Sequence, residues 1–263
     1  MGSRMKGFAP GRKIPASSKS HAMVMMAKAP VSGAVKSRLV PPLTEDEAAD
    51  LNRCFIADLC ASMKAAAAIV TDEAGVRVDE MIAYTPVGME AAFDGLMPAS
   101  FGLIAQRGDG LGERLINVAD DLLGMGYESV VLMNSDSPTI PDAILAAALA
   151  NLARPGDRIV IAGADDGGYC LIGVKRPHSR IFEDIAWSTA AVFAQTLERA
   201  GELGLDVVRL TNWYDVDDGA SLRRLVEELF GERSTRELRG FAAPATRAWL
   251  LAALDSGLAA RIG

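Results

Sequence analysis

The sequence MVMMAKAPVSGAVKSRL, residues 23–39, begins with an apolar run and continues into a basic loop that contains a glycine. Its apolar start has the composition of a buried strand. The loop carries Lys28, Lys36 and Arg38 and no acidic residue, although the whole chain has a formal net charge of −7. Gly33 would let backbone N–H groups approach a ligand closely, so the stretch predicts a phosphate-binding loop after a first strand. The plainer interpretation is a solvated loop, because the residue order is not that of a P-loop.

Composition limits the classes of function. The chain has 263 residues, of which 50% are hydrophobic, enough for one large domain or one domain with an appendage. Its acidic balance argues against non-specific nucleic-acid binding. Three cysteines and two histidines make neither a disulfide framework nor a histidine-rich zinc site. No apolar run approaches the ~20 residues needed to cross a bilayer, so we expect no membrane partner and a cytoplasmic location.

Apolar, strand-like runs alternate with helical patterns along the rest of the chain. A helix is expected after Thr44, which with Glu47 forms a capping-box pattern. Further strands are expected over 77–85, 101–106, 129–134, 158–164, 169–174 and 206–210, and helices over 111–123, 141–152, 189–200 and 219–230. This order predicts an α/β fold, a three-layer α/β/α sandwich with a mixed, mainly parallel sheet. A turn at 165–168 is compatible with one local antiparallel pair.

Both ends of the chain depart from this alternation. Residues 1–20 are rich in Gly, Ser, Pro and basic residues and contain no acid, so we interpret them as a disordered arm or a cloning remnant. The main domain is expected over 21–230. Residues 231–263 are expected to form a helical extension, with a helix over 245–254 that packs on the domain or contacts another copy of the chain.

An acidic residue follows the buried run 129–134. In open α/β sheets ligands bind beyond the carboxyl ends of the strands, which is where Asp136 is expected to lie. A carboxylate at that place suits Mg²⁺, which takes one or two carboxylates together with phosphate oxygens and water. The alternative is that Asp136 caps the next helix, but Ser137, Thr139 or Asp142 would serve equally well.

A second acidic group is expected from the segment that follows the last strand. Asp215 and Asp217 would face the same side if this segment is extended. Asp218 suits the N-cap of the last core helix. We choose Asp217 as the second metal ligand, and Asp215 remains a close competitor.

Two glycine-containing motifs add candidate binding residues. The sequence QRGDGLGER, residues 106–114, leads into a helix whose first turn holds Gly112 and Arg114, where N–H groups and a cation suit an anion. It is not a dinucleotide-binding fingerprint, because Glu113 occupies the third glycine position. Arg114 is alternatively a salt-bridged surface residue.

The sequence DDGGY, residues 165–169, joins two expected strands. Its two glycines permit either a tight turn or the close approach of a ligand. Tyr169 is either a core aromatic residue or a substrate contact. Two histidines provide no credible Ser-His-Asp set and no partner for Cys170. The remaining chemistry is phosphate transfer by positioning and charge stabilisation.

The chain resembles the DUF2064 family, the transferase 1 proteins associated with radical-SAM/selenodomain genes. These are relatives of the 2-phospho-lactate guanylyltransferases and have the nucleotide-diphospho-sugar transferase (GT-A) fold. The resemblance covers residues 23–225. It rests on six motifs in order: AKAP with Gly33 and KSRL, LGER at 111–114, SDSP at 135–138, DGGY at 166–169, WST at 187–189 and DVD at 215–217.

The resemblance implies a role for each motif. It implies a nucleotide-phosphate loop, a divalent metal (Mg²⁺ or Mn²⁺), and a site for a second substrate. The residues expected in the nucleotide site are Lys28, Gly33, Lys36, Arg38, Gly112 and Arg114; those holding the metal are Asp136 and Asp217; those facing the second substrate are Gly167, Gly168, Tyr169, Trp187, Ser188 and Thr189. We expect Lys36, Asp136 and Asp166 to be catalytic. The chain departs from the family at Ser32, usually Pro, and at Cys170, usually a larger residue.

Three functions compete. The first is Mg²⁺-dependent nucleotidyl transfer from an NTP to a phosphorylated small molecule, which the Lys-x-Arg loop favours because a triphosphate needs much neutralising charge. The second is glycosyl transfer from a nucleoside-diphosphate sugar, for which Asp166 is available as a base, although Asp136-Ser137-Pro138 lacks the second acid of a D-x-D motif. The third is a non-catalytic nucleotide-binding protein.

Overall fold

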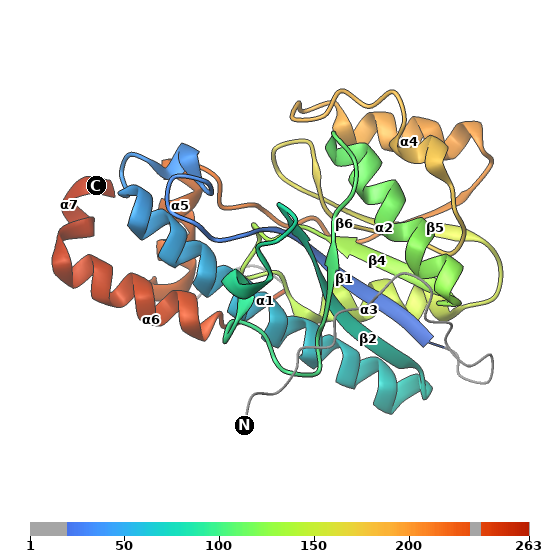
Figure 1. Ribbon diagram of the computed structural model, residues 1–263, viewed down its shortest axis with the longest axis horizontal. Helices are drawn as coiled ribbons and strands as arrows, with labels where there is room; N and C mark the ends of the chain where they lie inside the picture. Colours follow the sequence, from blue (N-terminus) through green and yellow to red (C-terminus); the bar gives the residue numbers. More distant parts are fainter. Residues whose placement is uncertain (1–19, 232–237, 263) are drawn as a thin grey trace.

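β1 (Ser20–Lys28), which contains the apolar run, is a central strand of one seven-stranded sheet in the computed structural model (Figure 1). The structure describes residues 20–231 and 238–262. The strand order is β3-β2-β1-β4-β6-β5-β7, with β2 (Arg77–Thr85), β3 (Gly102–Ala105), β4 (Ser129–Met133), β5 (Arg158–Gly163), β6 (Tyr169–Val174) and β7 (Asp206–Arg209). All neighbours are parallel except that β6 runs antiparallel to β4 and β5. The prediction of a mixed, mainly parallel sheet is confirmed.

Helices cover both faces of the sheet (Figure 1). One layer contains α1 (Glu45–Ala74), α3 (Asp142–Ala153), α5 (Gly219–Phe230) and α6 (Pro244–Ala253), and the other contains α2 (Leu111–Met125) and α4 (Val192–Glu202). Each strand contributes side chains to the hydrophobic cores on both faces of the sheet, because successive side chains of a strand point to opposite faces. On β1, Met23 and Met25 enter the core beneath α1, whereas Ala22 and Val24 enter the core beneath α2. The three-layer sandwich is confirmed.

The long helix α1 begins where its capping signal predicts. Thr44 Oγ1 accepts the N–H of Glu47, and the Glu47 carboxylate accepts the N–H of Thr44. The helix ends at Gly75, whose φ of 64° few other residues adopt at low cost. By length and composition α1 could cross a membrane, which corrects the expectation that no apolar segment approaches that length. However, 56% of its most apolar window is buried within the molecule, because α1 lies between the sheet and α6.

Helix α4 begins three residues later than expected. Thr189 donates its hydroxyl to Ala186 O (2.7 Å) and accepts the N–H of Ala191 (3.2 Å). Ser188 has a φ of 64°, which is outside the helical region. Side-chain bonds to the local backbone therefore hold this segment as a loop, as is typical for Thr and Ser.

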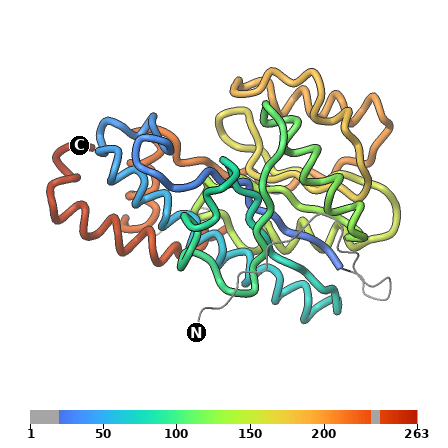
Figure 2. The backbone as a smooth tube through the Cα atoms, in the orientation of Figure 1, coloured from blue at the N-terminus to red at the C-terminus, as the bar shows by residue number. Residues whose placement is uncertain are grey.

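The chain beyond α5 packs on the main domain. Asp58 of α1 accepts the N–H groups of Ala245 (2.9 Å) and Thr246 (2.7 Å) and so caps the first turn of α6. The following η4 (Leu254–Leu258) and α7 (Ala259–Ile262) contribute Leu258 and Ile262 to the core beneath α1. Figure 2 shows this red segment running beside α1. A contact with another copy of the chain stays a prediction, and the arm predicted over residues 1–20 lies, apart from Ser20 in β1, outside the described residues.

Candidate functional site

A cleft of about 360 Å³ lies at the carboxyl ends of β1, β2, β3 and β4. This is the edge of the sheet where open α/β proteins bind ligands. The side chains that line it include four expected cations and two expected acids: Lys28, Lys36, Arg38, Arg114, Asp136 and Asp217. The structure therefore gathers residues from four separate motifs at one place.

The loop after β1 directs Lys36 into the protein. Lys36 has a left-handed backbone conformation (φ 50°, ψ 36°) directly before η1 (Ser37–Leu39). Such a conformation costs a non-glycine residue about 1 kcal/mol. The side chain is only 4% exposed, and its ammonium lies 5.2 Å from the ring centroid of Phe55. The position of this lysine is thus built into the loop rather than left to solvent.

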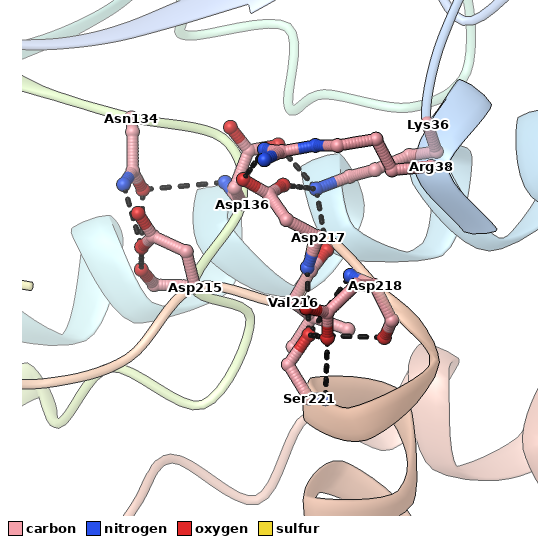
Figure 3. A network of polar contacts seen from close by, with 10 residues as sticks. Lys36, Arg38, Asn134, Asp136, Asp215, Val216, Asp217, Asp218 and Ser221 are labelled. Carbon is pink, nitrogen blue, oxygen red and sulfur yellow. Dashed lines mark hydrogen bonds and ion pairs between the residues drawn. The ribbon is translucent and has the colours of Figure 1, made fainter. Parts of the chain in front are cut away.

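The Lys36 ammonium joins two acidic residues (Figure 3). Its Nζ lies 2.5 Å from Asp136 Oδ1 and 3.1 Å from Asp217 Oδ1, and it donates to Val216 O at 2.8 Å. These three partners match the three donors of an ammonium group. Burial alone would lower the pKa of Lys36, but the two carboxylates outweigh burial and hold that pKa above its ordinary value. Arg38, which is exposed, pairs with the other oxygen of Asp217.

Asp136 and Asp217 meet although their strands are not neighbours. Asp136 follows β4, while the segment carrying Asp217 leaves β7 and returns across the sheet until Val216 N donates to Asp136 O (2.8 Å). The alternative of helix capping does not apply to Asp136, because the N-cap of α3 is Pro141. Capping does apply to Asp218, whose carboxylate accepts the N–H of Ser221 at the start of α5, as predicted.

Asp215 forms hydrogen bonds with neighbouring polar side chains and not with Lys36. Its Oδ1 accepts a hydrogen bond from Asn134 Nδ2 (2.7 Å; Figure 3). It accepts a second hydrogen bond from the Ser137 hydroxyl. Its pKa is raised to about 6, chiefly by burial and also by the nearby charge of Asp136, although the hydrogen bond from Ser137 acts to lower it. Of the two competing acids, Asp217 is the one that shares a cation with Asp136.

The pair of Asp136 and Asp217 fits one divalent cation. A single cationic nitrogen already touches both carboxylates, so both can reach one bound ion. Within residues 20–231 and 238–262, no group of three or more His, Cys, Asp or Glu side chains is arranged to hold a metal. Two carboxylates leave room for the phosphate oxygens and waters that Mg²⁺ keeps in its coordination shell.

A second cleft of about 350 Å³ shares Arg38 and Asp217 with the first. It is lined by Asp166, whose Oδ1 accepts the N–H of Gly168 (2.9 Å). Arg224 also lines it, stacked 3.7 Å from the ring centroid of Tyr214 and bonded to Asp165. Asp217 is therefore accessible from both clefts.

The remaining residues expected in the nucleotide site have mixed placements. Lys28 is exposed on the first cleft, and Gly33 has a φ of 71° beside Glu45. Arg114 lines the cleft but donates Nε to Gly108 O (2.9 Å) in its own loop. Gly112 is a packing glycine, since a Cβ there would lie 2.8 Å from Trp187 Nε1.

The six residues expected to face the second substrate lie together, beside the start of α2. Tyr169 and Trp187 make an edge-to-face contact with centroids 6.4 Å apart. Gly167 packs against the backbone of Ala190, where a Cβ would not fit. These residues, with Gly168, Ser188 and Thr189, are not part of the described walls of the two clefts. Their role toward a substrate stays a prediction.

Two carboxamides on the first cleft were missed. Asn52 of α1 is 3% exposed, and its Oδ1 is buried without a hydrogen-bond partner in the described part of the chain. Gln106, directly after β3, is 8% exposed. The signal for Asn52 was present in the sequence as a polar residue at helical spacing from Phe55 and Leu59 on the apolar stripe. Gln106 stood first in the motif at 106–114 but received no role.

The chain is similar to one protein family and to several proteins of known structure. A family model described as "Uncharacterized protein conserved in bacteria (DUF2064)" matches residues 66–189. A proposed nucleotide-diphospho-sugar transferase from Desulfovibrio desulfuricans G20 is 30% identical, with a TM-score of 0.72 over 93% of this chain and 98% of its own. No curated protein matches the chain.

Two further solved structures are similar to the chain at low identity and with TM-scores below 0.5. CMP:2-keto-3-deoxy-manno-octonic acid synthetase complexed with CTP is 14% identical, with a TM-score of 0.49 over 78% of this chain and 96% of its own. Rv0371c of Mycobacterium tuberculosis H37Rv in complex with manganese is 19% identical, with a TM-score of 0.42 over 80% and 99%.

Proposed function

The chain belongs to the DUF2064 family, and we propose that it is a metal-dependent nucleotidyltransferase. It would transfer the nucleotide of an NTP to a phosphorylated small molecule. One observation carries the proposal: the buried Lys36 ammonium joins Asp136 and Asp217 at the wall of a cleft that further cations line. A triphosphate with a bound metal ion has both negative and positive charge. The cations of the cleft suit its phosphates, and the two carboxylates suit its metal ion.

The reaction requires positioning and charge compensation more than acid–base chemistry. A bound Mg²⁺ or Mn²⁺, held by Asp136 and Asp217, would supply positive charge to the reacting phosphate. Lys36 and Arg38 adjoin these carboxylates, so their charges would be available to the triphosphate. An oxygen of the acceptor phosphate forms a bond to the α-phosphorus, the bond from that phosphorus to the bridging oxygen breaks, and pyrophosphate leaves.

The second cleft gives the acceptor a place to bind. It adjoins the first at Arg38 and Asp217, so a group bound there faces the reacting end of the nucleotide. Arg38 and Arg224 provide positive charge for an acceptor phosphate.

Glycosyl transfer is the second candidate. The 30% identical protein is a proposed nucleotide-diphospho-sugar transferase, and the second cleft contains the carboxylate of Asp166. That carboxylate is available as a base toward an acceptor hydroxyl. The two candidates differ in the nucleotide that they need, which makes them separable by binding.

The test is thermal stabilisation by each of the four NTPs and by UDP- and GDP-sugars, with and without Mg²⁺. We expect Mg²⁺-dependent stabilisation by an NTP in the wild type, and its loss in Asp136→Asn. Asp142→Asn is the matched control, because Asp142 is a half-buried residue in the first turn of α3 that lines neither of the two clefts. A preference for a nucleotide sugar would favour glycosyl transfer. Binding that needs no metal and gives no turnover would favour a non-catalytic nucleotide-binding protein.

A further inference from the structure

Gln106 is a buried amide at the wall of the first cleft. Its backbone N–H extends the β2–β3 pairing by donating to Tyr84 O (2.9 Å). Its side-chain Nε2 donates to Ala83 O (2.6 Å) and lies 3.5 Å from Ala27 O. The amide therefore lies across the ends of β1 and β2, held by the backbone of both strands.

These contacts fix which way the amide points. If the amide were reversed, Oε1 would face the carbonyl oxygens of Ala83 and Ala27, and acceptors repel one another. The oxygen must therefore point away from the strand ends. In the described residues no donor reaches it, and the residue lines the cleft. Water in the cleft can serve this acceptor in the free protein, whereas a bound ligand that excludes the water must supply a donor in its place.

Gln106 Oε1 lies at a different part of the first cleft from the acidic pair, Asp136 and Asp217. Asp136 follows β4, the neighbour of β1, so one to two strand spacings, about 5–10 Å, separate the amide from the phosphate end of the cleft. Here the cleft is lined by the neutral residues Met26, Ala27, Thr85 and Leu111, with the cations Lys28 and Arg114 beside them, and in the described part of the chain it has no acidic side chain of its own. A nucleotide has the same polarity, with a charged phosphate end and a flat, neutral base.

We propose that Gln106 selects the nucleobase: its Oε1 accepts a hydrogen bond from an amino group on the base edge. The ligand is then a nucleotide of cytosine, adenine or guanine, and a uracil nucleotide is disfavoured. Uracil places a carbonyl oxygen where cytosine carries its amino group, and two acceptors would meet. The inference rests on the nucleotide binding proposed above and deepens it by naming the class of base.

The test measures Kd by calorimetry in Mg²⁺ for nucleotides that differ by this amino group. CTP is compared with UTP, and ATP and GTP are compared with ITP. We expect at least one amino-bearing nucleotide to bind at least ~10-fold more tightly than its counterpart, the size typical of an unpaired buried acceptor. This comparison uses the wild-type protein and so does not depend on the folding of a variant.

Two variants then assign the preference to Gln106. Gln106→Met removes the acceptor, and Gln106→Lys removes it while keeping a donor for Ala83 O; both should bring the Kd ratio close to one. Gln195→Met is the matched control, because Gln195 Oε1 accepts the N–H of Ala186 outside the two clefts. The ratio is taken within each variant, so a partly unfolded sample does not alter it.

The outcomes separate this inference from the proposed function. If no nucleotide binds, the proposed function fails and the inference falls with it. If nucleotides bind but UTP and ITP bind as tightly as their counterparts, only the inference is overturned. It is also overturned if the wild-type preference survives unchanged in both Gln106 variants.

Discussion

At the scale of single residues, Lys36 acts as an internal counter-ion for Asp136 and Asp217. Its side chain is almost fully buried, while the two carboxylates are 35% and 27% exposed. Removing the ammonium leaves two close carboxylates without their shared cation, and like charges then repel. The lysine therefore stabilises the fold at the place where the ligand is proposed to bind.

We predict that Lys36→Met lowers the free energy of unfolding by about 2 kcal/mol, a value below that of a fully buried pair because the carboxylates remain partly solvated. Mg²⁺ should restore part of the loss, since a divalent cation replaces the missing charge. Urea denaturation with Mg²⁺ or with EDTA measures both effects. Arg38→Met is the control: that side chain is 71% exposed, so its loss should cost less than ~1 kcal/mol. Equal effects of the two variants would contradict the prediction.

Asp215 predicts a pH dependence. Its pKa is raised to about 6 in the folded protein, so the folded state holds a proton that the unfolded state has released. The free energy of unfolding should therefore fall as the pH rises from about 4 to about 6 and change no further above that range. A shift of this size corresponds to roughly 2–3 kcal/mol.

Asp215→Asn should flatten this slope. The measurement is urea denaturation of the wild type and the variant at intervals between pH 4 and pH 8. Asp142→Asn, at a half-buried site outside the two clefts, should leave the slope as it is. A wild-type slope that persists in Asp215→Asn would assign the dependence to another group.

The sequence predicted which charged residues line the cleft better than how these residues contact one another. Asp136 and Lys36 were found because charged residues that follow strands meet at one edge of a parallel sheet. Asp215 and Asp217 were not separable, because the choice depends on how the segment after β7 crosses the sheet and on the hydrogen bonds from Asn134 and Ser137. Such contacts join residues about 80 positions apart, and no local pattern encodes them.

At the scale of elements, the first turn of α2 depends on a glycine for packing. A Cβ at Gly112 would lie 2.8 Å from Trp187 Nε1 and 2.9 Å from Phe182 O. We predict that Gly112→Ala lowers the free energy of unfolding by about 1–3 kcal/mol, because the backbone of the neighbouring loop must move.

Gly124 on the same helix is the matched control. Nothing lies within 4 Å of a Cβ there, so Gly124→Ala should stabilise the protein by about 0.5–1 kcal/mol through helix propensity. Thermal unfolding of both variants compares the two effects. A stabilising Gly112→Ala would show that the loop after η3 (Ser179–Phe182) yields without cost.

The predicted elements were most accurate where local signals were strong. The capping box of Thr44 and Glu47 placed the start of α1, and α5 has the predicted bounds, 219–230. The start of α4 was wrong because Thr189 bonds to its own loop instead of beginning a helix. The packing of α6 on α1 was not predictable in detail, since it depends on a buried aspartate, Asp58, that helical spacing alone does not distinguish from an exposed one.

At the scale of the whole molecule, the segment after α5 completes the core beneath α1. Asp58 is its anchor, and we predict that Asp58→Ala lowers the free energy of unfolding by about 2–3 kcal/mol, because two N–H groups lose a buried acceptor. The melting temperature should fall by about 5–10 °C. Asp255→Ala, at an exposed position of η4, should leave it within about 1–2 °C. Equal melting temperatures for the two variants would mean that the cap does not hold the segment.

The crossing of the chain from β7 back to β4 has a consequence for the time course of folding. Lys36 and Asp217 are 181 positions apart, so their contact closes a very long loop. Contacts of this kind form slowly, after local helices and neighbouring strand pairs have ordered. In a refolding experiment, helical circular dichroism should recover first and the capacity to bind a nucleotide last. The lag between the two signals then measures how long after helix formation the segment that follows β7 crosses the sheet and brings Asp217 to Lys36.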